Sequence, residues 1–246
     1  MTGAATGSRE QARGQRLALL RCAFGQVGFV AVRALVRRMR LGVATTRGQV
    51  APFAQAWRQA NARDERGEGP LWVVLGDSSA QGVGAVGFDQ GYVGQLRVLL
   101  DAHDGKQWRV RNLSVSGARV ADVVAVQLPL LQELPRAPDL VTCAVGANDL
   151  LRTPMPRLIA SLRSLIAGLP SGAVIATLPQ GLAQSRARRV NALIRAEAPA
   201  RGLRVADVWA HTGPPWQGKY AEDFFHPNEH GYREWTAAFA ASLALG

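Results

Sequence analysis

The sequence predicts an α/β protein whose parallel sheet is covered by helices on both faces. From residue 71 onward, five short apolar segments alternate with segments of helical periodicity. Glycine-rich and polar turns follow several of the apolar segments, as expected where buried strands end at the edge of a sheet. Right-handed crossovers between parallel strands then give a three-layer α/β/α sandwich with a five-stranded parallel sheet.

The expected strands are short, and the segments between them carry apolar residues three and four positions apart. Leu71–Leu75 and Leu140–Val145 are apolar runs of the kind found in central strands that are buried on both faces. The strands are expected at residues 71–75, 108–115, 140–145, 173–178 and 203–208, and the helices at 92–102, 120–134, 156–169, 183–198 and 229–245.

The composition is that of a globular protein of one or two domains. The chain has 246 residues, 48% of them hydrophobic and 19% charged, which excludes a disordered or collagen-like protein. Its two cysteines, Cys22 and Cys143, are too few and too far apart for a disulfide-dense scaffold or a cysteine-rich zinc module. We expect neither a metal ion nor a cofactor.

The net charge of +11 is concentrated near the N-terminus. Residues 1–70 contain 12 arginines against 4 acidic residues, whereas residues 71–246 hold 17 cationic and 14 acidic residues. The body of the protein therefore lacks the basic surface that nucleic-acid binding requires, and we expect no nucleic-acid partner.

The first 43 residues are expected to form a basic, partly apolar helix. Their apolar run, residues 17–32, is interrupted by Arg21, which makes it a poor transmembrane span and a poor signal peptide. The polar residues on one side of the helix are Gln26, Arg33, Arg37 and Arg40. Such a helix either lies on an anionic membrane surface or packs on its own domain with the arginines in water. We expect a cytoplasmic protein, in the first case peripheral to the inner face of the membrane.

Residues 44–70 are expected to be a linker. They contain Gly, Pro, Arg and acidic residues, with only a short helical pattern near residues 53–60, and they end at Gly69-Pro70. The α/β domain then covers residues 71–246.

A serine follows the first expected strand, in the segment Gly76-Asp77-Ser78-Ser79-Ala80-Gln81-Gly82. The glycine permits a tight turn, and the serine is presented with its backbone N–H near the start of a helix. This is a suitable place for a nucleophile and for the stabilisation of an anion. The alternative is a serine that caps the helix in an ordinary strand–helix loop.

Two further blocks follow the second and third strands. Gly117, in Asn112-Leu113-Ser114-Val115-Ser116-Gly117, can bring a bare backbone N–H close to a substrate. Asn148, in Gly146-Ala147-Asn148-Asp149, carries a neutral amide that can donate to a developing oxyanion. Taken alone, the first block is only a turn, and the second only a cap for the next loop or helix.

The fourth block, Asp223-Phe224-Phe225-His226-Pro227, lies just before the last helix. A carboxylate three residues before a histidine can hold one imidazole nitrogen in a tight turn. The other nitrogen is then left to take a proton from a hydroxyl. This pairing favours a catalytic histidine over a structural one, and the other three histidines have no such partner.

In this order, the four blocks resemble the SGNH subgroup of the GDSL esterases and lipases. The resemblance covers residues 71–246 and implies a flavodoxin-like hydrolase domain with Ser78 as nucleophile, His226 as base and Asp223 as its orienting partner. It also implies an oxyanion hole made by the N–H groups of Ser78 and Gly117 and the amide of Asn148. Ser79 departs from the Leu or Thr that usually follows the nucleophile, which bears on pocket shape.

The expected function is that of a serine hydrolase that cleaves a small-molecule or lipid carboxylic ester through an acyl-enzyme. Alternatives on the same triad are a carbohydrate O-deacetylase and a thioesterase. A nucleotide-binding protein is a weaker reading: Gly82-Val83-Gly84-Ala85-Val86-Gly87 fits G-x-G-x-x-G but starts too far beyond the strand. An α/β-hydrolase would need a glycine where Ala80 stands. A non-catalytic lipid- or carbohydrate-binding protein would not need the intact triad.

Aromatic residues gather in the segment that leads to His226. Among them, Trp216, Phe224 and Phe225 are candidates for substrate binding. They either line an apolar pocket for the acyl or leaving group or pack beneath the loop.

Overall fold

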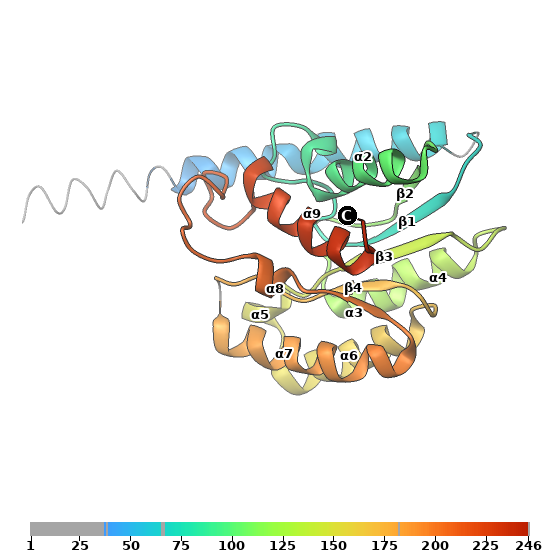
Figure 1. Ribbon diagram of the computed structural model, residues 1–246. Helices are drawn as coiled ribbons and strands as arrows, with labels where there is room; N and C mark the ends of the chain where they lie inside the picture. Colours follow the sequence, from blue (N-terminus) through green and yellow to red (C-terminus); the bar gives the residue numbers. More distant parts are fainter. Residues whose placement is uncertain (1–36, 38, 65–66, 182, 246) are drawn as a thin grey trace, which may run out of the picture.

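The structure, a computed structural model, describes residues 37, 39–64, 67–181 and 183–245 (Figure 1). It confirms the expected three-layer α/β/α sandwich with a five-stranded parallel sheet. The strands are β1 (Leu71–Gly76), β2 (Arg109–Asn112), β3 (Leu140–Ala144), β4 (Val174–Ala176) and β5 (Arg204–Ala206). They lie in the order β2-β1-β3-β4-β5, so the chain reverses its direction of travel across the sheet between β1 and β3. Sheets of this kind bind ligands at such a switch point, beyond the carboxyl ends of the strands.

Helices cover both faces of the sheet. Figure 1 shows α2 (Tyr92–Asp104) and α9 (Glu229–Leu243) on one side and α6 (Met155–Gly168) and α7 (Gln184–Glu197) on the other. The remaining helical segments are α3 (Val120–Asp122), the π-helical η2 (Val123–Gln127), α4 (Leu128–Gln132), α5 (Asp149–Arg152), α8 (Val208–His211) and the short 3-10 turns Phe88–Gln90 and Pro199–Arg201. The helices expected from periodicity are present, with ends that differ by a few residues.

The alternation of side chains along β1 divides the core into two layers. Trp72 and Val74 pack on the side of α2 and α9, while Val73 and Leu75 pack on the side of α6 and α7. Thr142 in β3 is buried but accepts a hydrogen bond from the Trp72 indole at 2.9 Å, so neither polar group is left unpaired.

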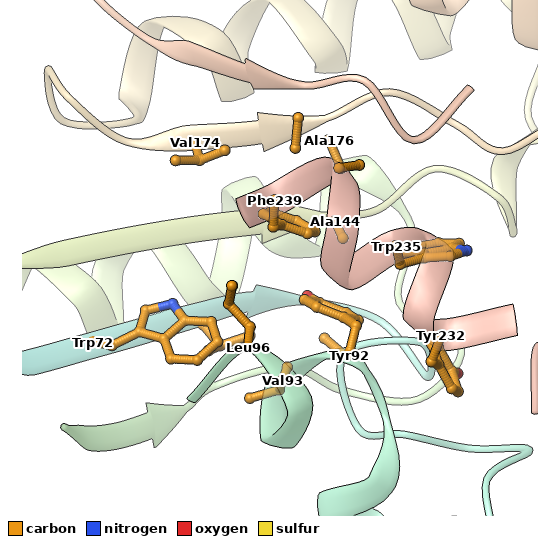
Figure 2. Packing of buried hydrophobic residues seen from close by; sticks show 14 of the residues in the cluster. Trp72, Tyr92, Val93, Leu96, Ala144, Val174, Ala176, Tyr232, Trp235 and Phe239 are labelled. Carbon is orange, nitrogen blue, oxygen red and sulfur yellow. The ribbon is translucent and has the colours of Figure 1, made fainter. Parts of the chain in front are cut away.

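Aromatic rings of α2 and α9 pack against one another on one face of the sheet (Figure 2). Tyr92 in α2 stacks on Phe239 in α9 with ring centres 4.9 Å apart, and on Trp235 at 5.8 Å. Tyr232, one turn before Trp235, is also fully buried. These contacts fix the first turns of α9, which directly follow the Asp223–Pro227 block.

The expectation of a linker over residues 44–70 is wrong for most of that range, because residues 39–64 form one helix. Its inward positions recur three and four residues apart, as in other buried helix faces. Several of them are small or polar, which hides the pattern from a search for apolar periodicity. The buried or half-buried positions are Gly42, Thr46, Gln49, Val50, Phe53, Ala54, Ala56, Trp57, Ala60, Asn61 and Asp64.

This 39–64 helix bonds to the edge of the sheet formed by β2. The side-chain amide of Asn61 exchanges two hydrogen bonds with the backbone of Asn112, both at 2.9 Å. The carboxylate of Asp64 accepts the N–H of Val110 at 2.8 Å. The helix therefore pairs three backbone groups of edge strand β2: the N–H of Val110 and both the N–H and the carbonyl oxygen of Asn112.

Most of the helix expected within residues 1–43 lies outside the described residues, and only residues 37 and 39–43 are seen to be helical. Among the helices of the described ranges, none combines the length and the apolar character needed to cross a membrane.

We predict that Trp57→Ala destabilises the protein by about 3–5 kcal/mol, as expected for a buried aromatic residue. Trp57 is 6% exposed, meets the ring of Phe88 edge-on at 5.0 Å and donates its indole N–H to the carbonyl oxygen of Gln81. The measurement is the free energy of unfolding in urea, with the exposed neighbour Arg58→Ala as control. A loss below about 1 kcal/mol would mean that this helix is not part of the folded domain.

Candidate active site

The loop after β1 begins at a glycine that no other residue replaces without strain. Gly76 has φ +149, and a Cβ there would collide with the carbonyl oxygen of Ala144 in β3. The buried side chain of Gln127 accepts the N–H of Gly76 and donates to its carbonyl oxygen, both at 2.8 Å. Strand β1 is thereby held at its last residue, two positions before Ser78. Gln127 was not predicted as part of the site, because its only signal in the sequence is a polar residue in the apolar run 123–131.

Three residues of the predicted triad form a continuous hydrogen-bonded chain. Ser78 Oγ lies 3.0 Å from His226 Nε2, and His226 Nδ1 lies 2.6 Å from Asp223 Oδ2. The second carboxylate oxygen of Asp223 accepts the N–H groups of Phe225 and His226, both at 3.0 Å. The structure thus brings together side chains from the loop after β1 and the turn before α9.

The hydrogen bonds to Asp223 determine its ionisation. Burial pushes the pKa of Asp223 upward, but hydrogen bonds from the His226 side chain and from the N–H groups of Phe225 and His226 outweigh it. The net result lowers the pKa of Asp223 to about 2. The carboxylate is therefore charged at neutral pH and accepts a hydrogen bond from Nδ1–H of the imidazole. That tautomer leaves Nε2 as an acceptor facing the Ser78 hydroxyl.

Among the described residues, two backbone N–H groups are free on the serine loop and on the neighbouring loop of Gly117. In the described part of the chain, no group accepts a hydrogen bond from the N–H of Ser78 or of Gly117. Gly117 has φ +84 and open space where a Cβ would stand. Its loop is tied to the serine loop by Gln81, which donates to the carbonyl oxygen of Ser114 and accepts the hydroxyl of Ser116. The two N–H groups are thus held on neighbouring, mutually bonded loops.

Asn148 lies on the third loop and faces the residue before the serine. Its amide nitrogen donates to the carbonyl oxygen of Ala118 at 3.1 Å and to Asp77 Oδ2 at 3.3 Å. The next residue, Asp149, is buried and accepts the N–H of Val120 at 2.9 Å, which fixes this loop to the start of α3. Both hydrogens of the Asn148 amide thus have acceptors, so the amide can donate to a further group only by giving up one of these two bonds.

A cavity of about 840 Å³ opens beside His226. Trp216, Phe224 and Phe225, the expected substrate-binding residues, all line it. Phe224 is 51% exposed and has a left-handed backbone with φ +56, so its ring is held away from the core. The other lining residues besides His226 are Ser79, Ala147, Leu150, Pro179, Gln180, Gly181, Gln217, Gly218, Tyr220, Ala221, Glu222, Pro227 and Trp235. The cavity is mostly apolar, with the serine loop and the histidine at its wall.

Comparison with protein families gives a match to the model of the GDSL-like lipase/acylhydrolase family over residues 74–234. This span includes every block described above. The chain belongs to this family, the SGNH hydrolases.

Solved structures with a similar fold were also found. TesA is 26% identical with a TM-score of 0.59, over 72% of this chain and 99% of that one. The lipase Lip_vut3 from a goat rumen metagenome is 17% identical with a TM-score of 0.62, over 71% and 97% of the two chains. Axe2, an acetyl xylan esterase from Geobacillus stearothermophilus, is 23% identical with a TM-score of 0.58, over 73% and 96%. A search of curated proteins found none that matches this chain.

The G-x-G-x-x-G pattern has a packing role in this SGNH hydrolase. A Cβ on Gly82 would lie 2.6 Å from the carbonyl oxygen of Phe88. A Cβ on Gly84 would lie 2.7 Å from Cβ of His226 and would also collide with the carbonyl oxygen of Pro227. These two glycines allow close approach of backbone segments, which accounts for them without a nucleotide.

His226 and His230 are four residues apart, a spacing that suits metal ligands on one helix face. Both ring nitrogens of His226 are already hydrogen-bonded, to Ser78 and Asp223. Within the described ranges, no group of three or more His, Cys, Asp or Glu side chains is arranged to hold a metal ion.

Asp77 is the most perturbed carboxylate beside the serine. Burial raises its pKa from 3.8 to about 6, although the N–H of Ser79 donates to it at 3.0 Å and favours the charged form. A raised pKa in the folded state means that the protonated group contributes stability below about pH 4, and that this contribution is lost as the pH rises through 6.

We predict that Asp77→Asn changes the pH dependence of stability. The asparagine cannot ionise, so the free energy of unfolding of the variant relative to the wild type should rise by on the order of 2 kcal/mol between pH 4 and pH 7. Urea unfolding at the two pH values measures this difference. An identical pH dependence in both proteins would show that Asp77 does not titrate in this range.

Proposed function

We propose that this SGNH hydrolase is a serine esterase that cleaves carboxylic esters through an acyl-enzyme intermediate. The observation that carries the proposal is the hydrogen-bonded chain Ser78–His226–Asp223, whose histidine lines a mostly apolar cavity. A nucleophile, a base within hydrogen-bonding distance and a charged group that orients the base are the parts that covalent acyl transfer requires.

The geometry supports the following sequence of steps. His226 Nε2 takes the proton of the Ser78 hydroxyl as Oγ attacks the carbonyl carbon of the ester. Asp223 holds the imidazole in place and stabilises its positive charge. The protonated His226 then gives the proton to the departing alcohol, which leaves an acyl group on Ser78. A water molecule, activated by the same histidine, hydrolyses this acyl-enzyme and restores the serine.

Charge on the carbonyl oxygen is proposed to be stabilised by three donors. The N–H groups of Ser78 and Gly117 are unengaged in the described structure, and the amide of Asn148 is the third donor. The two backbone donors are fixed before the substrate arrives, and such donors gain most as charge develops in the transition state.

The cavity favours an ester with an apolar acyl or leaving group. Its volume of about 840 Å³ exceeds what an acetyl group would fill, and Trp216, Phe224 and Phe225 offer aromatic surface. Deacetylation of a carbohydrate and hydrolysis of a thioester remain the alternatives on the same triad. Rates on p-nitrophenyl esters of increasing chain length distinguish them: the proposed apolar site predicts kcat/KM rising beyond the acetyl ester.

We predict that Ser78→Ala abolishes ester hydrolysis and leaves the fold intact, since the hydroxyl is the proposed nucleophile and alanine fits the same turn. Steady-state turnover of a short-chain p-nitrophenyl ester measures the effect. Ser79→Ala, at the adjacent cavity-lining position, is the matched control and should keep most of the activity. More than a small residual activity in Ser78→Ala would refute the mechanism.

We predict that Asn148→Ala lowers kcat by on the order of 10²–10³-fold. KM should change little, because the lost hydrogen bond acts on the transition state more than on the bound ester. The measurement is steady-state kinetics of the purified variant after its melting temperature has been checked. A normal kcat would remove Asn148 from the oxyanion hole and leave it with only its bonds to Ala118 and Asp77.

We also propose that residues 1–36 attach the enzyme to the inner face of an anionic membrane. The support is compositional: this segment holds five arginines, one acidic residue and the apolar run 17–32. Because the 39–64 helix packs on the domain, the anchor is proposed to end before it.

Removing residues 1–36 should therefore reduce binding to vesicles that contain anionic lipid, while turnover of a soluble short-chain ester stays near that of the full chain. Co-sedimentation with anionic and with neutral vesicles measures the first effect. Equal binding by the full and shortened chains would exclude the anchor.

A further inference from the structure

The 39–64 helix lies before the residues matched by the family model, yet it contacts the segments that carry the proposed triad. It reaches the turn of Asp223 through Gly42, the loop beneath His226 through Gln49, and the loop of Ser78 through Trp57. Figure 1 shows it running along the outside of the domain next to α2.

Gly42 places the helix backbone directly against the backbone that leads into Asp223. A Cβ added to Gly42 would lie 2.6 Å from the backbone nitrogen of Asp223 and would collide with the carbonyl group of Glu222. Both groups are main chain, so neither can move aside as a flexible side chain would. Any larger residue at this position must displace either the helix or the turn that carries Asp223.

Gln49 holds the loop on which His226 rests. Its Oε1 accepts the N–H of Gly84 and its Nε2 donates to the carbonyl oxygen of Ala85, both at 2.9 Å. Gly84 in turn lies so close to His226 and Pro227 that it has no room for a side chain. The loop of Gly84 and Ala85 is therefore packed between the 39–64 helix and His226.

The far side of the same loop is tied to α9. The hydroxyl of Tyr232 donates to the carbonyl oxygen of Val83 at 2.7 Å, and the N–H of Val86 donates to Glu229 at 2.6 Å. The loop of residues 83–86 is thus bonded to Gln49 on one side and to α9 on the other. A shift of the helix would therefore move this loop and, with it, the turn that carries His226.

The helix also touches the serine side of the site. The indole of Trp57 donates to the carbonyl oxygen of Gln81, whose side chain ties the Ser78 loop to the loop of Gly117. The 39–64 helix therefore contacts the loops on both sides of the Ser78–His226 hydrogen bond.

We propose that the 39–64 helix is a positioning element of the active site, in which Gly42 and Gln49 hold the Asp223–His226 turn at hydrogen-bonding distance from Ser78. This inference rests on the proposed function, because it assigns these residues a role only if Ser78 and His226 react together. Neither Gly42 nor Gln49 lines the cavity beside His226, and both act through the turn. Displacement of a base by about 1 Å is enough to cost up to 10²-fold in rate.

The first test compares Gly42→Ala with Gly48→Ala, two glycines of the same helix. A Cβ on Gly48 meets nothing within 4 Å, so the control adds a methyl group without a clash. We measure kcat and KM on a short-chain ester and divide kcat by the fraction of enzyme that a fluorophosphonate labels. We expect Gly42→Ala to lose about tenfold or more in kcat per reactive serine, with KM within about twofold and an altered pH profile. Gly48→Ala should match the wild type.

The second test uses another residue of the helix, in case Gly42→Ala does not fold. Gln49→Ala removes both bonds to the loop but introduces no clash, and the exposed Gln55→Ala on the same helix is its control. A purely structural role would lower the melting temperature and leave kcat per reactive serine and the pH profile unchanged. That result in Gln49→Ala overturns the proposal.

A failure of the proposed function and a failure of the positioning role give different results. If Ser78→Ala is still labelled and active in this assay, the proposed function is wrong. If Ser78→Ala is inactive while Gln49→Ala has wild-type kcat per reactive serine and a wild-type pH profile, only the positioning role of the helix is wrong.

Discussion

The hydrogen bond between Ser78 and His226 joins residues 148 positions apart, and the fold brings them together at 3.0 Å. Neither loop sets this distance alone. The serine side is fixed at the end of β1, where Gly76 lies against Ala144 and is paired with Gln127. The histidine side is fixed by the start of α9, whose aromatic residues stack on α2. The bond therefore depends on the core that connects β1, α2 and α9.

Buried polar groups form the framework around this bond. Gln127, Asn112, Gln81 and Asp149 all lie inside the domain, and each is hydrogen-bonded to backbone of a loop that the site uses. A buried polar group left unpaired costs about 1–3 kcal/mol, so each of these bonds penalises a shift of its loop. In the described ranges, only Tyr92 Oη and Arg186 Nε are buried side-chain atoms without a partner. Hydrogen bonds from buried side chains, in addition to apolar packing, thus hold the loops of the site in place.

The sequence predicts the sheet and the four blocks because both have local signatures. Apolar runs that end in Gly-Asp or Gly-x-Asn-Asp mark strand ends, and parallel strands bring those ends to one edge. The 39–64 helix was missed because its inward face contains Gly42, Thr46, Gln49 and Asn61, which recur at helical spacing without being apolar. Gln127 was missed because its partner, the backbone of Gly76, is 51 residues away. Such pairings depend on the fold and leave no pattern in the nearby sequence.

The most direct test of the central claim is to identify the residue that reacts with a fluorophosphonate. The protein is treated with the reagent, digested and analysed by mass spectrometry, with His226→Ala treated in parallel. The account predicts a single adduct on the peptide that contains Ser78, formed rapidly in the wild type and much more slowly in His226→Ala, because the histidine no longer takes the serine proton. An adduct on another residue, or ester hydrolysis that continues while Ser78 is fully blocked, would contradict it.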